Sequence, residues 1–373
     1  MSTIFVTGGN GYLGSYTATQ LLSEGHRLAL LVRAGSRREA LEKLWATWQL
    51  HWDVETFAAH LSKIRIIRGD LHAPDLGVSA GDQDRLREEA DSILHIAASL
   101  NRKSDKACLN TNLRGTLSVI KLARFLRDHG HLQRYSHVST VAVAGERNKE
   151  IVHEDAAIDF GRSDYDPYGR TKKFCEHMAR ELLPDIPLTF FRPSIVMGDA
   201  RHERTTQFDM VRAFCVIADL PLIPLDPNTR LDIVNADWVG HAIATLHTKA
   251  ETAFDTYHLS AGISSLSARQ IADALVASTG RTARFAGSLD RAFDVAVRAM
   301  NRAPRGTPVA GLGALLKVFW PYVTYDTVFD NARAVTEVGR APTPFDAYCS
   351  DLYRWSKAND FTFRATPLPA SIA

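Results

Sequence analysis

The chain has 373 residues, of which 45% are hydrophobic and 23% charged, and its formal net charge is +2. This composition is typical of a soluble globular protein, and a charge balance so close to neutrality argues against a nucleic-acid partner. The four cysteines, Cys108, Cys175, Cys215 and Cys349, are far apart and form no Cys-x-x-Cys pair, so neither a disulfide framework nor a metal site is expected. Because a strand is predicted almost at Met1, we expect no signal peptide and a cytoplasmic location.

The first predicted strand covers residues 4–6 and is followed at once by the sequence TGGNGYLG and by a helix over 12–23. Gly8, Gly11 and Gly14 therefore fall on a strand-to-helix turn. Such a turn must bend sharply, and it lets a diphosphate approach the backbone while the helix N-terminus faces the anion. A glycine triplet alone is a weak signal, but this context predicts a dinucleotide site that includes Gly8, Asn10, Gly11, Tyr12 and Leu13.

A second buried strand is predicted over 27–32, and in a doubly wound fold its end meets the adenosine ribose of the cofactor. No acidic residue stands there to bind the 2′-hydroxyl of NAD. The sequence continues instead with Arg33, Ser36 and Arg37, whose side chains can donate charge-assisted hydrogen bonds to a 2′-phosphate. We therefore expect NADP(H), with the two arginines as clamps and Ser36 as a helper. The alternative is that the arginines only begin a solvated helix.

Two further strands, predicted over 64–67 and 92–95, continue the doubly wound pattern, and a long helix over 105–128 follows them. Asp70 is placed to accept a hydrogen bond from the adenine amino group. Small residues after the fourth strand let the backbone lie close to the cofactor. Asn112, inside the helix, is expected to brace the site rather than to touch substrate. The residues predicted to line the cofactor site after these strands are Asp70, Leu71, Ala97, Ala98 and Ser99.

A fifth strand is predicted over 135–138 and leads into Ser139 and Thr140, while Tyr168 and Lys172 begin a later helix, one turn apart on one face. An unperturbed phenol has a pKa of about 10, and an ammonium one turn away stabilises the phenolate and can hold the nicotinamide ribose. Strand alternation directs Ser139 and Thr140 to opposite faces, so one of the two is expected to face substrate, and Thr140 is favoured as the hydroxyl that fixes a substrate carbonyl oxygen. Hydride could then reach the carbonyl carbon while Tyr168 protonates the oxygen, so the predicted catalytic residues are Thr140, Tyr168 and Lys172.

Taken together, these motifs resemble the extended short-chain dehydrogenase/reductases over roughly residues 1–265, and most closely the thioester reductase and fatty acyl-CoA reductase branch, the male sterility type. The matching stretches are TGGNGYLG, LLVRAGSRREALEKL, IRGDLHAPDLGVS, LHIAASLN, NTNLRGT, HVSTVAVAG, YGRTK and FFRPSIVMGD. The resemblance implies an α/β fold with a doubly wound parallel sheet and a smaller, mostly helical C-terminal substrate domain. It also implies that Thr140, Tyr168 and Lys172 form the triad, with Pro193 and Ser194 beside the nicotinamide.

The expected domains are discontinuous. Residues 1–200 and 231–255 should form the NADP-binding domain, and residues 201–230 and 256–373 the substrate-binding domain. Enzymes of the resembled branch are often the last domain of a carrier-protein machine, whereas nothing here precedes the nucleotide-binding fold. We therefore expect the substrate to come from a free carrier protein, from coenzyme A or from solution, and by analogy we expect a homodimer.

Two apolar stretches carry less specific information. The segment 309–323 has one charge, Lys317, and is too short to span a membrane, which takes about 20 apolar residues. Three interpretations are open for this segment. The favoured one is a core helix, and the others are a wall of a pocket for an apolar substrate and a contact with a membrane surface. Two terminal helices are expected over 325–361, broken at Pro342 and Pro344. A stripe at helical spacing is predicted to be core: Leu41, Leu44, Trp45, Trp48 and Trp52.

These patterns predict an NADPH-dependent reductase that transfers hydride to the carbonyl of an acyl thioester, aldehyde or ketone on a hydrophobic substrate. With a thioester, the resulting hemithioacetal would collapse to release a thiol and an aldehyde. A hydroxysteroid-type or flavanone-type dehydrogenase would use the same triad and is the alternative. A nucleotide-sugar epimerase is disfavoured because such enzymes usually hold NAD, and a non-catalytic cofactor sensor because Tyr168 and Lys172 are both present.

Overall fold

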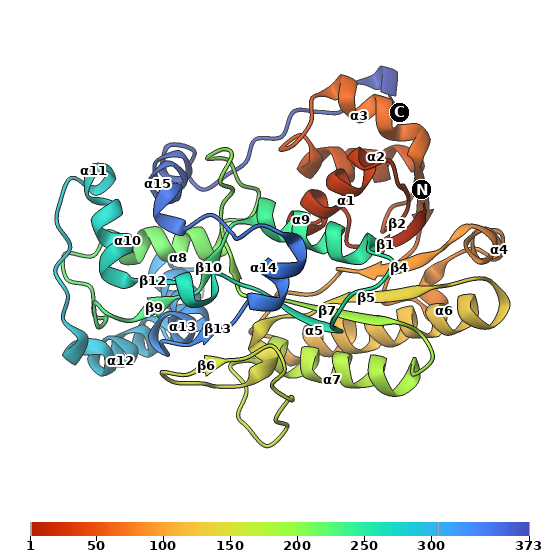
Figure 1. Cartoon of the computed structure of the whole chain (residues 1–373). Coiled ribbons are helices and arrows are strands. Elements are labelled where there is room, and N and C mark those ends of the chain that lie inside the picture. Colours follow the sequence, from red (N-terminus) through yellow and green to blue (C-terminus); the bar gives the residue numbers. More distant parts are fainter. Residues whose placement is uncertain (1, 305, 373) are drawn as a thin grey trace.

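The computed structural model describes residues 2–304 and 306–372, and its centre is a seven-stranded parallel sheet (Figure 1) with the strand order β11-β7-β5-β4-β1-β2-β3. The chain moves outward from the central β1 and then returns to the other side of it at β4. Crevices for ligands form at such reversal points, outside the carboxyl ends of the strands. The predicted doubly wound fold is confirmed. Its strands are β1 (Thr3–Thr7), β2 (Arg27–Val32), β3 (Ile64–Arg68), β4 (Ser92–His95), β5 (Arg134–Val138), β7 (Leu188–Pro193) and β11 (Thr256–Leu259).

Helices cover both faces of this sheet (Figure 1) and bury a separate hydrophobic core on each. The predicted tryptophan stripe is confirmed as core, because Trp45 and Trp48 are buried and Trp52 is half-buried against them. One face carries α1 (Tyr12–Ser23), α2 (Arg37–Trp48), α3 (Val54–His60), α9 (Ala236–Thr248) and α14 (Ala332–Val338). The other face carries α4 (Ala80–Glu89), α6 (Gly115–His129) and α7 (Pro167–Leu182).

The helix predicted over 105–128 is not continuous. It consists of α5 (Asp105–Cys108), a wide π-helical turn over Leu109–Arg114, and α6. The turn directs the buried side chain of Asn112 toward the strand ends, where its Oδ1 accepts a hydrogen bond from Ser99 N at 2.7 Å and its Nδ2 donates to Thr171 Oγ1 at 3.1 Å. The interruption therefore lets one amide connect the loop after β4 to helix α7.

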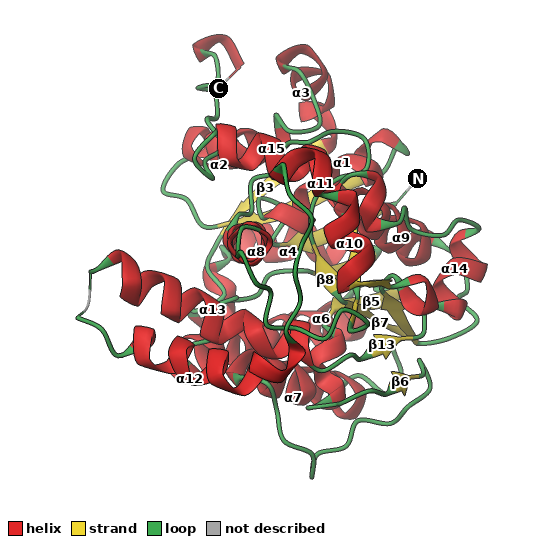
Figure 2. Ribbon diagram, turned by 90° about the vertical axis from the view of Figure 1, so that its left-hand side faces the viewer, coloured by secondary structure: helices red, strands yellow, loops and turns green. Residues whose placement is uncertain are grey.

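A second group of elements lies beside the sheet (Figure 1) and packs around its own core. Figure 2 shows α12 and α13 running side by side within it. Its helices are α8 (Asp209–Ala218), α10 (Ala268–Ala274), α11 (Val276–Thr279), α12 (Asp290–Asn301), α13 (Pro308–Thr324) and α15 (Cys349–Ala358). Short strands pair β6 (Ile151–Val152) with β13 (Val328–Phe329) and β8 (Ile195–Val196) with β10 (Ile233–Val234). A further pair, β9 (Arg230–Leu231) with β12 (Leu266–Ser267), packs on the core of the second group.

Two segments lie on the other side of the domain boundaries expected from the sequence. Strand β11 pairs with β7, so the return to the sheet extends through Leu259, beyond the expected limit at 255. Near the C-terminus the chain also returns to the nucleotide-binding part, where Trp45 Nε1 donates to Thr366 O at 2.9 Å. In both cases a contact between residues far apart in the sequence brings the segment to the nucleotide-binding part, and no local sequence pattern indicates to which domain the segment belongs.

Helix α13 contains the apolar stretch 309–323. Leu316, Phe319 and Trp320 are buried, as expected of a core helix, whereas Val309 is 50% exposed. Phe319 also lines the main cavity described below, so the helix both packs and forms a cavity wall. Among the residues that the structure describes, none of the helices combines the length and the apolar character needed to cross a bilayer.

Candidate active site

A cavity of about 680 Å³ opens at the carboxyl ends of the central strands and is lined by the glycine turn, the loops after β2 to β7, and the end of α13. Three of the predicted site residues, Ser36, Arg37 and Asn112, are not part of its described lining. The other predicted site residues all line the cavity: Gly8, Asn10, Gly11, Tyr12, Leu13, Arg33, Asp70, Leu71, Ala97, Ala98, Ser99, Thr140, Tyr168, Lys172, Pro193 and Ser194.

The glycine turn is a backbone cradle packed too closely for side chains at Gly8 and Gly14. Gly8 has φ +78°, and a Cβ added there would lie 2.7 Å from Ala97 N, while a Cβ at Gly14 would lie 1.9 Å from Gly8 O. Gly11 is the N-cap of α1. No side chain caps this helix, whose residues the structure all describes, and its first turn contains no acidic residue. The first N–H groups of α1 therefore remain free for an anion at the cavity floor. These residues fit the diphosphate of a dinucleotide.

Two cationic side chains, Arg33 and Lys43, line the end of the cavity beyond β2. Arg33 is exposed, with Nη1 3.8 Å from Asp70 Oδ2, and Lys43 of α2 donates from Nζ to Arg33 O at 2.6 Å. Lys43 lines the cavity and was missed by the sequence analysis, which expected cofactor contacts at the start of this helix and core residues from Leu41 onward. Ser36 is instead the N-cap of α2, since its Oγ accepts from Glu39 N at 3.1 Å.

Tyr168, Lys172 and Thr140 converge on the same cavity from α7 and from the loop after β5. Tyr168 is buried, and the neighbouring Thr140 hydroxyl is among the groups that lower the pKa of its phenol. Lys172 is 1% exposed, and its Nζ donates to Val138 O at 2.7 Å. Ser139 lines the cavity as well, because the regular strand ends at Val138 and alternation no longer separates the two hydroxyl residues. The Ser139 Oγ is buried and has no hydrogen-bond partner among the described residues.

Burial dominates the electrostatics of this group. It raises the pKa of Tyr168 to about 12, and the nearby cation that opposes this shift most is Arg102, a residue that the sequence analysis did not single out. Burial also lowers the pKa of Lys172. The Nε2 atom of His137 lies 3.3 Å from Lys172 Nζ. Burial and the Lys172 ammonium lower the pKa of His137 well below its usual value, so its imidazole is neutral. Of Tyr168, Lys172 and His137, the phenol of Tyr168 is therefore the candidate general acid, and the charges around it set its pKa.

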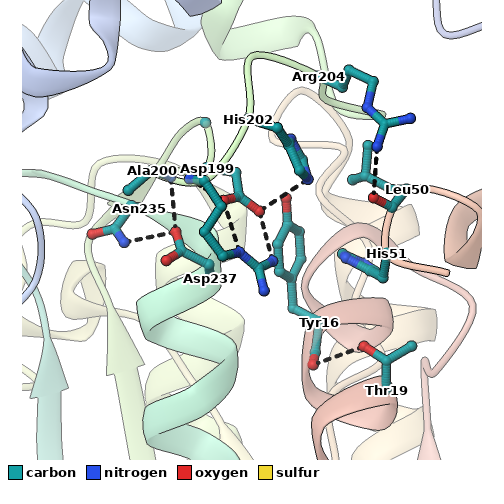
Figure 3. A network of polar contacts seen from close by, with 12 residues as sticks. Tyr16, Thr19, Leu50, His51, Asp199, Ala200, His202, Arg204, Asn235 and Asp237 are labelled. Carbon is teal, nitrogen blue, oxygen red and sulfur yellow. Dashed lines mark hydrogen bonds and ion pairs between the residues drawn. The ribbon is translucent and has the colours of Figure 1, made fainter.

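The cavity wall beside Tyr12 is held by a buried polar network (Figure 3), which the sequence analysis did not predict. The carboxylate of Asp199 is fully buried, and its Oδ2 accepts from Arg201 Nη2 at 2.8 Å. At the start of α9, Asp237 Oδ1 accepts from Asn235 Nδ2 at 2.7 Å. Figure 3 shows Tyr16 of α1 directed at the same loop. The Tyr16 hydroxyl has no hydrogen-bond partner among the described residues, and α1 is joined to the loop that leads into α8 by the hydrogen bond that Tyr12 Oη donates to Gly198 O at 3.4 Å.

A smaller apolar cavity of about 70 Å³ lies between α8, α10 and α13. It shares Ile195, Met210 and Phe319 with the main cavity. Most of its wall consists of aliphatic and aromatic side chains, with Thr279 and Arg281 as the polar exceptions among the described lining residues. The two cavities are therefore neighbours, separated by apolar side chains.

The sequence matches the family described as Male sterility protein over residues 6–243. Nonribosomal peptide synthetase asaC of Aspergillus flavus is 28% identical over 273 residues, which cover 69% of this chain and 26% of that protein. Carboxylic acid reductase of Mycobacterium tuberculosis is 27% identical and covers 69% of this chain and 24% of its own length. Fatty acyl-CoA reductase wat of Drosophila melanogaster is 26% identical, covering 57% and 46%. The chain thus spans less than half the length of each of these relatives.

Solved structures support the same fold. The terminal R domain from the myxalamid PKS-NRPS biosynthetic pathway has a TM-score of 0.80 at 24% identity, covering 98% of this chain and 92% of that one. UDP-glucuronic acid 4-epimerase from Bacillus cereus has a TM-score of 0.64 at 18% identity, covering 98% and 100%. Because the family match extends over more than half of the sequence, the chain belongs to the male sterility protein family, the thioester reductase and fatty acyl-CoA reductase branch of the extended short-chain dehydrogenase/reductases.

Proposed function

We propose that this protein is an NADPH-dependent reductase that transfers hydride to the carbonyl carbon of an acyl thioester or an aldehyde on a hydrophobic substrate. The observation that carries the proposal is the convergence of the glycine cradle with Tyr168, Lys172 and Thr140 on one cavity. Membership of a family whose relatives include a carboxylic acid reductase and a fatty acyl-CoA reductase supports it.

In this proposal NADPH supplies the hydride, and the residues of the chain manage the carbonyl oxygen. Thr140 and Tyr168 hold that oxygen by hydrogen bonds. As the new C–H bond forms, the carbonyl π electrons move onto the oxygen, which takes the phenol proton of Tyr168. With a thioester, the hydroxyl proton then returns to Tyr168, the C–S bond breaks, and a thiolate leaves with its electron pair and is protonated by water. Lys172 lines the same cavity and would hold the nicotinamide ribose.

The cofactor preference rests on charge at one end of the cavity. Arg33 and Lys43 both line it beyond β2. A guanidinium donating to a phosphate contributes about 1.5–3 kcal/mol, equivalent to roughly tenfold to a hundredfold in affinity. Two cations at this place favour the 2′-phosphate of NADPH over the 2′-hydroxyl of NADH.

The substrate preference rests on the apolar walls. Phe319 and Met210 line the main cavity and lead to the smaller apolar cavity between α8, α10 and α13. An acyl chain placed there would be removed from water at about 0.8 kcal/mol per methylene. The similarity to a nonribosomal peptide synthetase favours presentation on a carrier protein, and coenzyme A thioesters and free aldehydes are the other sources of the same carbonyl.

The proposal is tested by incubating the protein with NADPH and octanoyl-coenzyme A or octanal. We expect NADPH to be consumed, and with the thioester we expect one free thiol for each aldehyde formed. Oxidation of a secondary alcohol without any thioester or aldehyde reduction would favour the hydroxysteroid-type dehydrogenase instead. Turnover of a nucleotide sugar without net NADPH consumption would favour an epimerase.

A matched pair of variants tests the cofactor assignment. Arg33→Ala should weaken NADPH binding about tenfold to a hundredfold and leave NADH binding within about threefold. Arg37→Ala, which removes an arginine outside the cavity lining, should change neither. The measurement is the dissociation constant of each cofactor by calorimetry. An equal loss for NADPH and NADH in Arg33→Ala would contradict the assignment.

A further inference from the structure

We infer that Arg102 is a positioning residue for the acid–base step: its guanidinium, held over the ring of Tyr168 by Asp166 and Tyr322, stabilises the phenolate that remains when Tyr168 gives up its proton. The inference rests on the proposed role of Tyr168 as general acid. It assigns the charge that tunes this acid to a residue outside the predicted triad.

The guanidinium of Arg102 lies between two aromatic rings. Its Cζ is 4.8 Å from the centroid of the Tyr168 ring and 4.6 Å from the centroid of the Tyr322 ring. The Arg102 side chain is 18% exposed and lines the main cavity. A cation over the face of a phenol is attracted by the ring, and far more strongly once the ring carries the charge of a phenolate.

Asp166 fixes the arginine in this place. Arg102 Nη1 donates to Asp166 Oδ2 at 3.1 Å and also to the hydroxyl of Tyr322, which in turn donates to Asp166 Oδ2 at 2.8 Å. The other carboxylate oxygen, Oδ1, caps helix α7 by accepting from Gly169 N at 2.9 Å. The loop after β4, the start of α7 and the end of α13 are therefore joined through one guanidinium directly beside Tyr168.

The charged and titratable groups that face Tyr168 come from several elements. Arg102 opposes the effect of burial on the Tyr168 pKa, Asp166 and Cys108 raise that pKa, and the Thr140 hydroxyl lowers it. Lys172, one turn further along α7, directs its Nζ at Val138 O instead. In this arrangement the cation that faces the phenol ring is an arginine from another segment.

The size of the effect follows from the distance. A unit charge 4.8 Å from the ring centroid, at an effective dielectric constant of about 20, shifts a phenol pKa by about 2.5. The carboxylate of Asp166 opposes part of this shift. Removing the arginine charge should therefore raise the pKa of Tyr168 by about one unit or more, and removing the Asp166 charge should lower it.

The experiment labels the protein with 3-fluorotyrosine, whose phenol is more acidic than that of tyrosine and therefore titrates at lower pH. The fluorine resonance that disappears in Tyr168→Phe belongs to Tyr168, and its titration midpoint is followed in the full chain without cofactor or substrate. We expect the midpoint to rise by about one pH unit or more in Arg102→Met and to fall in Asp166→Asn, where asparagine keeps the helix cap.

Two further variants separate charge from structure. Arg102→Lys retains the positive charge, and its midpoint should lie closer to that of the unsubstituted protein than the midpoint of Arg102→Met. Tyr322→Phe removes a hydrogen bond but no charge, and it should shift the midpoint less than either charge deletion. If Arg102→Met does not fold, as judged by its thermal transition, the fall of the Tyr168 midpoint expected in Asp166→Asn, together with a midpoint near that of the unsubstituted protein in Arg102→Lys, still decides the question.

An unchanged Tyr168 midpoint in Arg102→Met, or a shift of the same sign in Arg102→Met and Asp166→Asn, overturns the inference. The proposed function is tested separately, and it fails if NADPH is consumed with neither octanoyl-coenzyme A nor octanal. The two tests are independent because the fluorine titration needs no turnover. Where turnover is observed, the pH profile for alcohol oxidation with NADP⁺ should also move to higher pH in Arg102→Met, because the phenolate is then the base.

Discussion

Replacing Glu176 by glutamine should destabilise the protein far more than removing an ordinary carboxylate. Glu176 lies one turn beyond Lys172 on α7, and its two oxygens accept from Arg192 Nε at 3.0 Å and Arg192 Nη2 at 2.7 Å. The Glu176 side chain is fully buried and that of Arg192 is 7% exposed. The pair therefore connects the helix that carries Tyr168 to strand β7, next to Pro193 on the cavity wall.

The magnitude follows from the burial of both charges. Breaking a buried ion pair by removing one partner leaves an uncompensated charge and costs about 3–5 kcal/mol. Glutamine keeps one acceptor for the guanidinium, so we expect Glu176→Gln to lower the free energy of unfolding by about 3 kcal/mol, at the lower end of this range. Replacing both partners, in Glu176→Leu with Arg192→Met, removes the unpaired charge and should recover most of that loss.

Urea denaturation followed by far-UV circular dichroism measures this free energy of unfolding. The matched control is Glu42→Gln, which breaks the pair of Arg38 Nε with Glu42 Oε1 at 2.8 Å on the surface of α2. Those side chains are 44% and 47% exposed, so the control should cost about 0.5 kcal/mol or less. Similar losses in Glu176→Gln and Glu42→Gln would refute the argument.

Three further predictions concern the nucleotide-binding part. Trp48→Phe removes the indole N–H that donates to Gly9 O at 2.8 Å, and it should cost about 1–3 kcal/mol in urea denaturation and weaken NADPH binding. Gly14→Ala places a Cβ 1.9 Å from Gly8 O, a backbone atom, so NADPH binding by calorimetry should be lost. Burial raises the pKa of Glu154 from 4.5 to about 7, so the folded state holds this proton more tightly than the unfolded state does. The free energy of unfolding therefore falls as the pH rises from about 4.5 to about 7. Across this range the thermal transition temperature of Glu154→Gln should fall less than that of the unsubstituted protein.

The parts of the fold that follow local rules could be predicted from the sequence. Strand β2 and helix α1 have the predicted limits, because each is a continuous apolar or amphipathic run bounded by turn residues. The glycine turn was recognisable for the same reason. The assignment of Ser36 to the cofactor overlooked a local signal, since Ser36 followed by Glu39 is the pattern of a helix N-cap, and the structure places it there.

The parts of the site that depend on long-range contacts could not be predicted. Arg102 and Tyr322 are 220 positions apart, and no local pattern indicates that they meet over Tyr168. The π-helical turn over Leu109–Arg114 likewise depends on what Asn112 bonds across the fold, rather than on helix propensity. Lys43 reaches the cavity only because α2 packs against the sheet with this side chain toward Arg33.

The most direct measurement is the rate of NADPH oxidation with octanal for the unsubstituted protein and for Tyr168→Phe. Phenylalanine retains the buried ring and removes the proton that the proposed mechanism delivers to the carbonyl oxygen. We predict that kcat falls by about 10²–10⁴ while the NADPH dissociation constant and the thermal transition stay close to those of the unsubstituted protein. An unchanged kcat in Tyr168→Phe would contradict the proposed role of this tyrosine as the general acid.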